Sequence, residues 1–449
     1  MTPITEPSTT APPSTVTLLR FATAGSVDDG KSTLVGRLLH DTRSVASDQL
    51  EAVTTASRNR GQETPDLALL TDGLRAEREQ GITIDVAHRY FSTPRRRFIL
   101  ADTPGHVQYT RNMVTGASTA ELAVVLVDAR KGVLEQTRRH TAVAALLRVP
   151  YLLLAVNKMD LVGYREEVFA EISAAFAEVA AGLGAPVPLA VPVSALTGDN
   201  VVSPAARMDW YGGPSLLQLL ETVEPGFDVL DCPARFPVQY VIRSDSVAHR
   251  DYRGYAGQIT AGILRTGERV VALPSGRTSV ITGIDRLGES VDLAWAPQSV
   301  ALTLADELDI SRGALIAPVD AAPELTRRIE ATVCHLHEQP LQVGARVLVK
   351  HGARIVRGEV LQIPSRLGLD DLRHRPAGDR LEANDIGRLV LRTSEPLPVN
   401  DYADCRRTGA FLLIDPADGS TLTAGMVGRA FETRSGVDHA PSTAAASSS

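Results

Sequence analysis

A glycine-rich loop near the N-terminus constrains the fold of this chain more than any other feature. Residues 25–32 read Gly-Ser-Val-Asp-Asp-Gly-Lys-Ser; they follow the apolar run 18–24 and open a segment with helical periodicity. The glycines allow backbone N–H groups to turn inward around phosphate groups, and Lys31 can reach the terminal phosphates. The positive end of the following helix faces the same anion. Strand, loop and helix together predict the phosphate-binding unit of a nucleotide-binding domain.

A tetrapeptide after a second apolar run indicates which nucleotide base the domain binds. It consists of Asn157, Lys158, Met159 and Asp160 and follows residues 151–156. The Asp160 carboxylate can accept hydrogen bonds from guanine N1–H and the 2-amino group, whereas adenine offers neither donor and would leave this carboxylate unpaired. We expect Asn157 to tie the base-binding loops together and the Lys158 stem to pack along the ring. The tetrapeptide therefore favours GTP over ATP.

A tripeptide at a further strand end completes the expected base site. Ser194, Ala195 and Leu196 close the apolar run 187–193. In isolation this tripeptide carries little information. In chain order after a phosphate loop, it matches the loop whose backbone N–H meets guanine O6.

The pentapeptide Asp-Thr-Pro-Gly-His at residues 102–106 predicts the site of hydrolysis, because it follows the strand-like run 98–101. We expect Asp102 to hold Mg²⁺ through water and the Gly105 N–H to sense the γ-phosphate. Phosphoryl transfer depends on positioning and charge stabilisation, so a residue that orients the attacking water matters greatly. We assign that role to His106.

Thr83, within the segment 78–85, is a candidate for a second protein hydroxyl on Mg²⁺ beside Ser32. Its role would depend on the γ-phosphate, with an ordered segment in the GTP state and a released one in the GDP state. The long polar interval 44–76 suits a mobile insertion over the nucleotide. All five segments fall in the order expected when each lies at the carboxyl end of a sheet strand.

The expected site is therefore made of a few contiguous groups. The predicted catalytic residues are Lys31, Thr83 and His106, and the predicted Mg²⁺ ligands are Ser32, Thr83 and, through water, Asp102. The predicted GTP-binding residues are Gly25, Ser26, Val27, Asp28, Asp29, Gly30, Lys31, Ser32, Thr33, Asp102, Thr103, Pro104, Gly105, His106, Asn157, Lys158, Met159, Asp160, Ser194, Ala195 and Leu196.

The chain changes character once, near residue 225. Before this point, short apolar runs alternate with helical segments, of which 165–182 is the clearest, and this predicts a doubly wound, mainly parallel α/β sheet. After it, strand-like runs separated by Gly and Pro recur about every ten residues, which predicts two all-β barrels. The predicted units are a disordered tail at 1–15, a GTP-binding domain at 16–226, barrel domains at 227–322 and 323–434, and a second disordered tail at 435–449.

Composition narrows the class of protein further. A formal net charge of −7 argues against broad nucleic-acid binding, which requires a large basic surface. The three cysteines lie far apart, without metal-type spacing, and are expected to be reduced thiols. The N-terminal tail lacks the apolar core of a signal peptide, and the longest apolar runs have only strand length. We expect a cytoplasmic protein without membrane segments.

These motifs resemble the translation-factor class of GTPases, which carries Gly-Ile-Thr and Asp-Thr-Pro-Gly-His segments, and the two β-domains are similar to those of elongation factor Tu. Within that class, the chain resembles the large subunit of bacterial sulfate adenylyltransferase from about residue 18 to 426. Elongation factors more often have histidines where Ser26 and Asp29 stand. Further similar runs lie at 253–257, 348–352, 384–387 and 408–415, and runs at 72–86 and 210–217 are nearly shared with archaeal-type elongation factors. His88, where the subunit usually has tyrosine, and the stretch 245–251 depart from it.

The resemblance implies GTP and Mg²⁺ as ligands and a heterodimer with a smaller catalytic subunit that binds ATP and sulfate. Synthesis of adenylyl sulfate creates a high-energy mixed anhydride, and the family couples GTP hydrolysis to it. The chain contains no second phosphate loop and no C-terminal adenylyl-sulfate kinase, so we expect no kinase activity. An alternative is a translational GTPase that delivers aminoacyl-tRNA, which would share the architecture. A third is a GTP-dependent binding switch without an enzymatic partner.

Three short basic runs remain outside these motifs. They lie at 95–97, 138–140 and 406–407. Such runs are more often solvated surface than contacts to phosphate or to a partner, and we expect them to be solvated.

Overall fold

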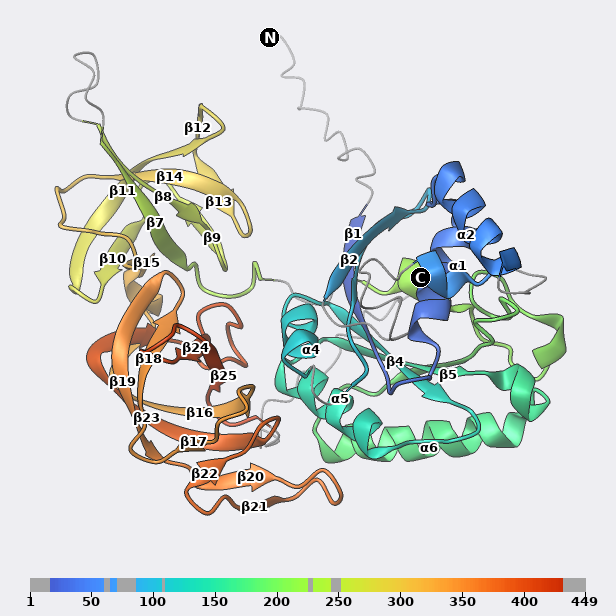
Figure 1. Ribbon diagram of the computed structural model, residues 1–449. Helices are drawn as coiled ribbons and strands as arrows, with labels where there is room; N and C mark the ends of the chain where they lie inside the picture. The colour runs from blue at the N-terminus through green and yellow to red at the C-terminus, as the bar shows by residue number, and fades with distance from the viewer. Residues whose placement is uncertain are drawn as a thin grey trace, which may run out of the picture.

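The computed structural model describes residues 17–59, 65–70, 86–106, 110–224, 229–243 and 252–430. The first part is built on a six-stranded sheet in the order β2-β3-β1-β4-β5-β6 (Figure 1). Strands β3, β1, β4, β5 and β6 are parallel, and β2 alone is antiparallel to its neighbour. The strands are β1 Thr17–Ala24, β2 Ala87–Ser92, β3 Arg96–Asp102, β4 Leu122–Asp128, β5 Tyr151–Asn157 and β6 Leu189–Pro192.

Helices cover both faces of this sheet. Alternate side chains of β4 enter two separate apolar clusters, one containing Val125 and the other Leu126. A parallel strand buried on both faces reads as a continuous apolar run, which explains why every residue of β4 is buried. The helices are α1 Lys31–Asp41, α2 Ser47–Asn59, α4 Thr110–Ala117, α5 Glu135–Leu146, α6 Glu166–Gly182 and α7 Leu216–Thr222, with short 3₁₀ turns at Leu67–Leu70, Met159–Val162 and Ala206–Met208.

The next part is an antiparallel barrel, called here the first barrel. Its sheet runs β10-β15-β7-β8-β14-β11-β12, and pairing of β10 with β11 closes it. Strands β9 and β13 form a separate antiparallel pair, and their Leu264 and Ala294 belong to the apolar cluster of this barrel. Its strands are β7 Phe236–Arg243, β8 Arg253–Gln258, β9 Ile263–Arg265, β10 Arg269–Leu273, β11 Arg277–Arg286, β12 Glu289–Val291, β13 Leu293–Trp295, β14 Ser299–Leu304 and β15 Leu315–Pro318.

The last part, called the second barrel, closes in the same way. Its sheet runs β16-β25-β24-β18-β19-β23-β20-β21, and β16 also pairs with β23. A 3₁₀ turn at Val319–Ala321 lies between the two barrels. The strands are β16 Glu324–His335, β17 Leu341–Gln342, β18 Arg346–His351, β19 Arg354–Gln362, β20 Ser365–Leu367, β21 His374–Pro376, β22 Arg380–Leu381, β23 Ile386–Val399, β24 Ala410–Ile414 and β25 Thr421–Val427.

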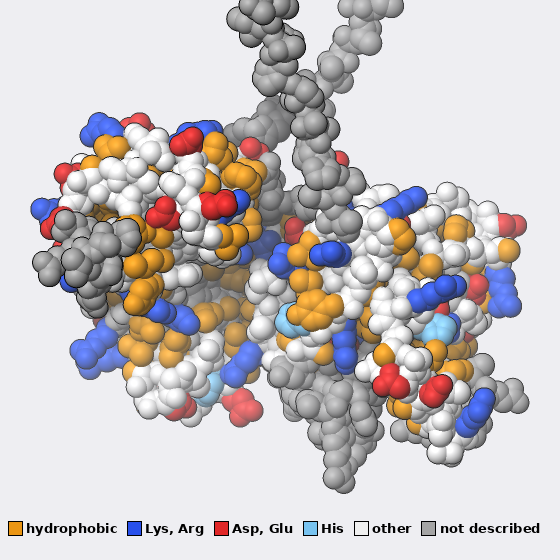
Figure 2. Space-filling model, turned by 90° about the horizontal axis from the view of Figure 1, so that it is seen from above, with side chains coloured by type: hydrophobic (Ala, Val, Ile, Leu, Met, Phe, Trp, Pro, Cys, Tyr) orange, Lys and Arg blue, Asp and Glu red, His pale blue; other side chains and the backbone are white. Residues whose placement is uncertain are grey.

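The barrels face the side of the first part that carries α4 and α5 (Figure 1). One apolar cluster spans this boundary: Met113 of α4 and Leu147 after α5 belong to it together with Tyr402 and Met426 of the second barrel. Viewed from above, acidic, basic and apolar side chains are interspersed over the described surface (Figure 2). In the described residues, no helix has the length and apolarity needed to cross a membrane.

The predicted fold class is confirmed: a mainly parallel, doubly wound domain is followed by two barrels. Part of the polar interval 44–76, which we expected to be a mobile insertion, forms the helix α2, and its mobility stays a prediction. One sequence interpretation needs correction. Arg96, assigned to a solvated hairpin tip, is buried, and its guanidinium donates to Leu220 O at 2.9 Å and to Val223 O. It thereby satisfies carbonyls at the end of α7 that lack a helical partner.

Candidate nucleotide-binding site

The glycine-rich loop lies between β1 and α1 and is stabilised by a hydrogen bond between two of its own residues. Asp29 is buried, and its Oδ2 accepts a hydrogen bond from the Ser26 N–H at 2.6 Å. Burial is the largest influence on the Asp29 carboxyl and raises its pKa, although Ser26 and the Lys31 ammonium act in the opposite direction. Gly30 has a φ of 90°, and a Cβ there would lie 2.5 Å from Asn157 Nδ2. Only glycine satisfies both the conformation and the space.

Lys31 is the buried cation of this loop. Its Nζ donates to Gly25 O at 2.8 Å and to Ser26 O at 2.9 Å. Burial lowers the pKa of its ammonium, and the carboxylates of Asp102 and Asp29 counteract that effect. The ammonium thus lies against the backbone that surrounds the candidate phosphate position.

The segment 102–106 leaves β3 directly beside the loop. Asp102 is buried, and Thr23 Oγ1 donates to its Oδ1 at 3.0 Å. A Cβ at Gly105 would lie 2.3 Å from Lys31 Nζ, so the Gly105 backbone lies against the loop. His106 is exposed. The strand register that pairs Thr23 with Asp102 brings these two segments together.

Asn157 connects the phosphate loop to the last loop of the site. Its Nδ2 donates to Asp29 O at 2.7 Å, and its Oδ1 accepts from Ala195 N–H at 3.0 Å. Asp160 Oδ1 accepts from the buried Ser194 hydroxyl at 2.7 Å. One amide therefore fixes three loops that are far apart in the sequence.

Lys158 spans the gap between the phosphate loop and β4. Its Nζ donates to Asp28 O and forms an ion pair of 3.0 Å with Asp128 Oδ2. Burial raises the pKa of Asp128, but hydrogen bonds from Arg130 and Lys158 outweigh it and hold this pKa well below its usual range. The stem of Lys158 is fixed at both the loop and the sheet.

The structure thus places four of the five predicted segments at one edge of the sheet. The phosphate loop, 102–106, 157–160 and 194–196 are linked by these contacts. Thr83, in the fifth segment, lies outside the described residues, as does the stretch 245–251. Leu196 is exposed, and its carbonyl accepts from Arg37. The individual roles of these residues stay predictions.

His140 is a residue of this site that the sequence interpretation missed. It was assigned to a solvated basic run, but it is fully buried under the phosphate loop, and its Nδ1 accepts from Gly25 N–H at 3.0 Å. In a neutral ring Nε2 therefore carries the proton, and because the Gln136 amide lies 2.9 Å away, its oxygen rather than its nitrogen must face Nε2 to accept this hydrogen bond. Burial, with help from Lys31 and Arg139, lowers its pKa to about 3. Buried residues at 137, 140, 141 and 144 give the helical spacing that could have revealed it.

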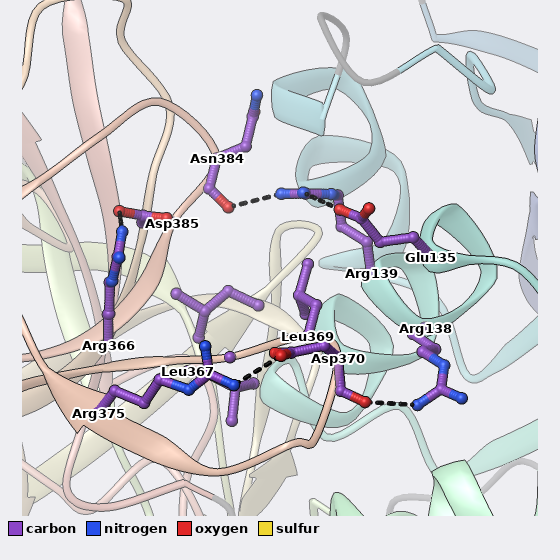
Figure 3. Close-up of a pocket in the computed structure, with 12 residues that line it drawn as sticks. Glu135, Arg138, Arg139, Arg366, Leu367, Leu369, Asp370, Arg375, Asn384 and Asp385 are labelled. Carbon is purple, nitrogen blue, oxygen red and sulfur yellow. Dashed lines mark hydrogen bonds and ion pairs between the residues drawn. The ribbon is translucent and has the colours of Figure 1, made fainter.

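The neighbouring arginines on α5 face the second barrel. Figure 3 shows Arg138 and Arg139 pointing across a cavity of about 590 Å³ toward Asp370 and Asn384. Arg138 Nη1 donates to Asp370 O at 3.0 Å and Arg139 Nη1 to Asn384 O at 3.1 Å. The solvated assignment is therefore wrong for this run. Helix α5 therefore contacts the phosphate loop through His140 and the second barrel through Arg138 and Arg139.

The phosphate loop contains two buried polar atoms that matter for ligand binding. Ser26 Oγ and Asp29 Oδ1 are buried and have no hydrogen-bond partner among the described residues. The Ser26 hydroxyl can donate to a phosphate oxygen, whereas the Asp29 carboxylate oxygen is an acceptor and cannot, so only Ser26 is a candidate phosphate contact. For Mg²⁺, the candidate donors Ser32 and Asp102 are oxygen ligands, the type that this ion prefers. Among the described residues, no group of three or more His, Cys, Asp or Glu side chains is placed to hold a metal ion.

This fold and loop arrangement define a GTP-binding protein of the P-loop class. The family model of the elongation factor Tu GTP binding domain matches residues 16–227, and that of the GTP-eEF1A C-terminal domain-like family matches 328–428. These matches confirm GTP as the nucleotide and the translation-factor type of GTPase domain.

Two curated relatives cover most of the chain. The bifunctional enzyme CysN/CysC of Mycobacterium tuberculosis is 51% identical over 419 residues, which are 93% of this chain and 68% of that protein. Sulfate adenylyltransferase subunit 1 of Aeromonas salmonicida is 48% identical over 412 residues, 91% of this chain and 86% of that protein. A solved structure of sup35 complexed with GDP has 22% identity and a TM-score of 0.41 over 92% of this chain, too low to support an argument. The chain belongs to the sulfate adenylyltransferase subunit 1 family, which confirms the resemblance drawn from its motifs.

Proposed function

We propose that this chain is the GTPase subunit of a sulfate adenylyltransferase and that it couples GTP hydrolysis to synthesis of adenylyl sulfate and pyrophosphate on a smaller catalytic partner. The observation that carries the proposal is the linked set of loops around Lys31 and Asn157, in a chain 48–51% identical to members of this family. The partner binds ATP and sulfate, and the protein acts in the cytoplasm.

The phosphate loop holds GTP in this proposal. The loop backbone and Lys31 surround the β- and γ-phosphates, and α1 adds its dipole. Asp160 accepts the guanine donors, and Lys158 lies along the ring. Because Asn157 already bonds to both Asp29 O and Ala195 N–H, base and phosphate are held in a fixed relation.

Hydrolysis takes place beside Gly105. His106 orients the attacking water, and its exposed position after the buried segment 102–105 leaves its side chain accessible. Ser32, Thr83 and, through water, Asp102 would hold Mg²⁺, and the ion would neutralise charge that develops on the phosphate oxygens. Lys31 supplies a fixed positive charge at the same place.

The test is adenylyl sulfate formation from ATP and sulfate by this chain co-expressed with a candidate catalytic subunit, with and without GTP. Pyrophosphate release should rise with GTP, and Lys31→Ala or His106→Ala should reduce the GTP-dependent part roughly tenfold or more. Matched controls are Lys350→Ala and His337→Ala in the second barrel, which should leave it unchanged.

The outcomes separate the parts of this proposal. GTP hydrolysis without adenylyl sulfate would refute the sulfate function and leave the GTPase intact, and binding of aminoacyl-tRNA would then favour the translational alternative. Equal losses in the Lys31 and Lys350 variants would refute the role of the loop lysine.

A further inference from the structure

Residues 400–409, called here the junction loop, lie where the three parts of the chain meet. Toward the GTP-binding domain, Tyr402 Oη donates to Leu147 O at 3.1 Å and Arg406 Nη2 to Ser118 O at 3.0 Å. Toward the first barrel, the loop bonds through Asn400 to Arg235 at 2.9 Å and through Arg407 to Gln258 at 2.7 Å. A covalent bond at this loop would act on all three parts.

Two of the three cysteines meet at this loop. Cys232, just before the first barrel, donates its Sγ–H to Asp404 O at 3.1 Å. Across a trans peptide, a carbonyl oxygen lies about 2.8 Å from the next Cα, so the Cys232 sulfur is within about 6 Å of the Cα of Cys405. The Cα and Sγ atoms of a cysteine are about 2.8 Å apart, so the two Cα atoms lie within about 9 Å of each other, whereas a disulfide joins Cα atoms that are about 4.4–6.8 Å apart. Formation of the bond therefore requires Cys232 Sγ to leave Asp404 O, with any remaining gap closed by movement of the segment around Cys232.

The surroundings of the two cysteines are compatible with a disulfide that forms when an oxidant is present. Cys232 is partly exposed, whereas Cys405 is buried and Cys334 is fully buried in the apolar cluster between the GTP-binding domain and the second barrel. The buried Arg235 guanidinium interacts electrostatically with both Cys232 and Cys405. An entering oxidant therefore meets Cys232 first, and Cys405 is in place as the second thiol.

We propose that Cys232 and Cys405 are a redox-active pair that forms a reversible disulfide with a peroxide or a small-molecule disulfide as oxidant. With a peroxide, the Cys232 thiolate attacks one oxygen, the O–O bond breaks, and a sulfenic acid and water form. The Cys405 thiolate then attacks the Cys232 sulfur, an S–S bond forms and the second oxygen leaves as water. The bond ties the segment that enters the first barrel to the junction loop of the second barrel.

The rate of this reaction depends on the thiolate form. Burial raises the pKa of the Cys232 thiol, Cys405 raises it further, and Arg235 lowers it. Thiolate is therefore scarce at neutral pH, and the oxidation is slower than that of a low-pKa sensor cysteine. In a reducing compartment the bond is transient.

The experiment treats the full chain with hydrogen peroxide at mildly alkaline pH, counts free thiols and maps peptides under non-reducing conditions. We expect loss of two of the three thiols, a cross-linked peptide pair that carries Cys232 and Cys405, and recovery with dithiothreitol. The oxidised chain should also unfold at a higher denaturant concentration, because the cross-link restricts the unfolded state.

Cys232→Ser is the informative variant because its position is partly exposed, and it should leave Cys405 free after treatment. Cys405→Ser should leave Cys232 without the intramolecular partner; if that variant does not fold, the peptide map of the Cys232→Ser chain decides. Dimers linked through Cys232, a Cys232 adduct with free Cys405, or three unreacted thiols would each overturn the proposal. None of these readouts depends on GTP hydrolysis or adenylyl sulfate.

Discussion

The two barrels have the same closed, antiparallel design, but they meet the rest of the molecule differently. The second barrel shares an apolar cluster with α4, α5 and α6, which includes Tyr402 and Met426. The apolar cluster of the first barrel is drawn from its own residues and the segment that leads into it. Its described contacts through Arg235 and Gln258 go to the junction loop instead. Helix α5 therefore connects the phosphate loop directly to the second barrel, because it contacts both.

The strongest test of this difference removes a side chain from the shared cluster. Tyr402→Ala deletes a buried ring and its hydrogen bond to Leu147 O, and we expect it to lower the free energy of unfolding by about 3–5 kcal/mol. The control is Tyr240→Ala on the first barrel, where the side chain is 67% exposed and the expected change is within about 0.5 kcal/mol. Guanidinium denaturation measures both. Similar losses of unfolding free energy in Tyr402→Ala and Tyr240→Ala would contradict the proposed difference between the two barrels.

A second test addresses the face of α5 that carries His140. Its folded pKa is about 3, far below the usual value, so the unfolded state takes up the proton first as the pH falls below about 6.5. Its stabilisation is complete above that pH, and about 2 kcal/mol should be lost by pH 5. His140→Asn keeps an acceptor for Gly25 N–H but does not titrate in this pH range. The variant should therefore show a weaker dependence of the free energy of unfolding on pH.

Urea denaturation between pH 7 and pH 5 measures this effect. Burial also lowers the pKa of His335 and His351, so the difference between the wild-type and variant slopes isolates His140. Parallel slopes would contradict a neutral, accepting imidazole under the phosphate loop.

A smaller effect is expected from the arginines on the opposite face of α5. Arg139→Gln removes the hydrogen bond to Asn384 O and the ion pair with Glu135, with an expected cost of about 1–2 kcal/mol. Arg95→Gln is the control because Arg95 is exposed, and its ion pair with Glu221 should contribute less than about 0.5 kcal/mol. Thermal unfolding compares them, and an equal shift in melting temperature would show that the barrel contact adds nothing.

The smallest change is expected on the surface of the first barrel. Leu287 is 97% exposed, and Leu287→Ser should alter the free energy of unfolding by no more than about 0.5 kcal/mol. Denaturant titration of this variant beside Leu413→Ser, a fully buried position in the second barrel, checks the contrast. A loss above 1 kcal/mol for the Leu287 variant would imply a contact beyond the barrel surface.

The phosphate and base loops could be predicted because their chemistry needs particular residues in short, continuous order. The fold class followed from the alternation of apolar runs and helices before residue 225 and its disappearance afterwards. The strand β2 was only implied, by the hairpin tip placed at residues 95–97, because Tyr90 and His88 are exposed on an outer strand that buries little. Its apolar signal is weak for that reason.

The contacts between the parts could not be predicted in the same way. Arg96, Arg138 and Arg406 each donate to backbone carbonyls far away in the sequence. Every residue has such a carbonyl, so the sequence of the acceptor contains no signal. The three arginines therefore looked like ordinary surface charge until the fold placed carbonyls opposite them.

Closure of both barrels limits how another chain can attach. An open sheet offers unpaired N–H and C=O groups to an incoming strand, but β10 pairs with β11 and β16 pairs with β23. In the described part of the chain, the central sheet keeps two outer strands, β2 and β6. A polypeptide that binds by strand addition must therefore use one of these edges or a short strand outside the closed walls, such as β12 or β21. One that binds a barrel wall must be recognised by side chains alone.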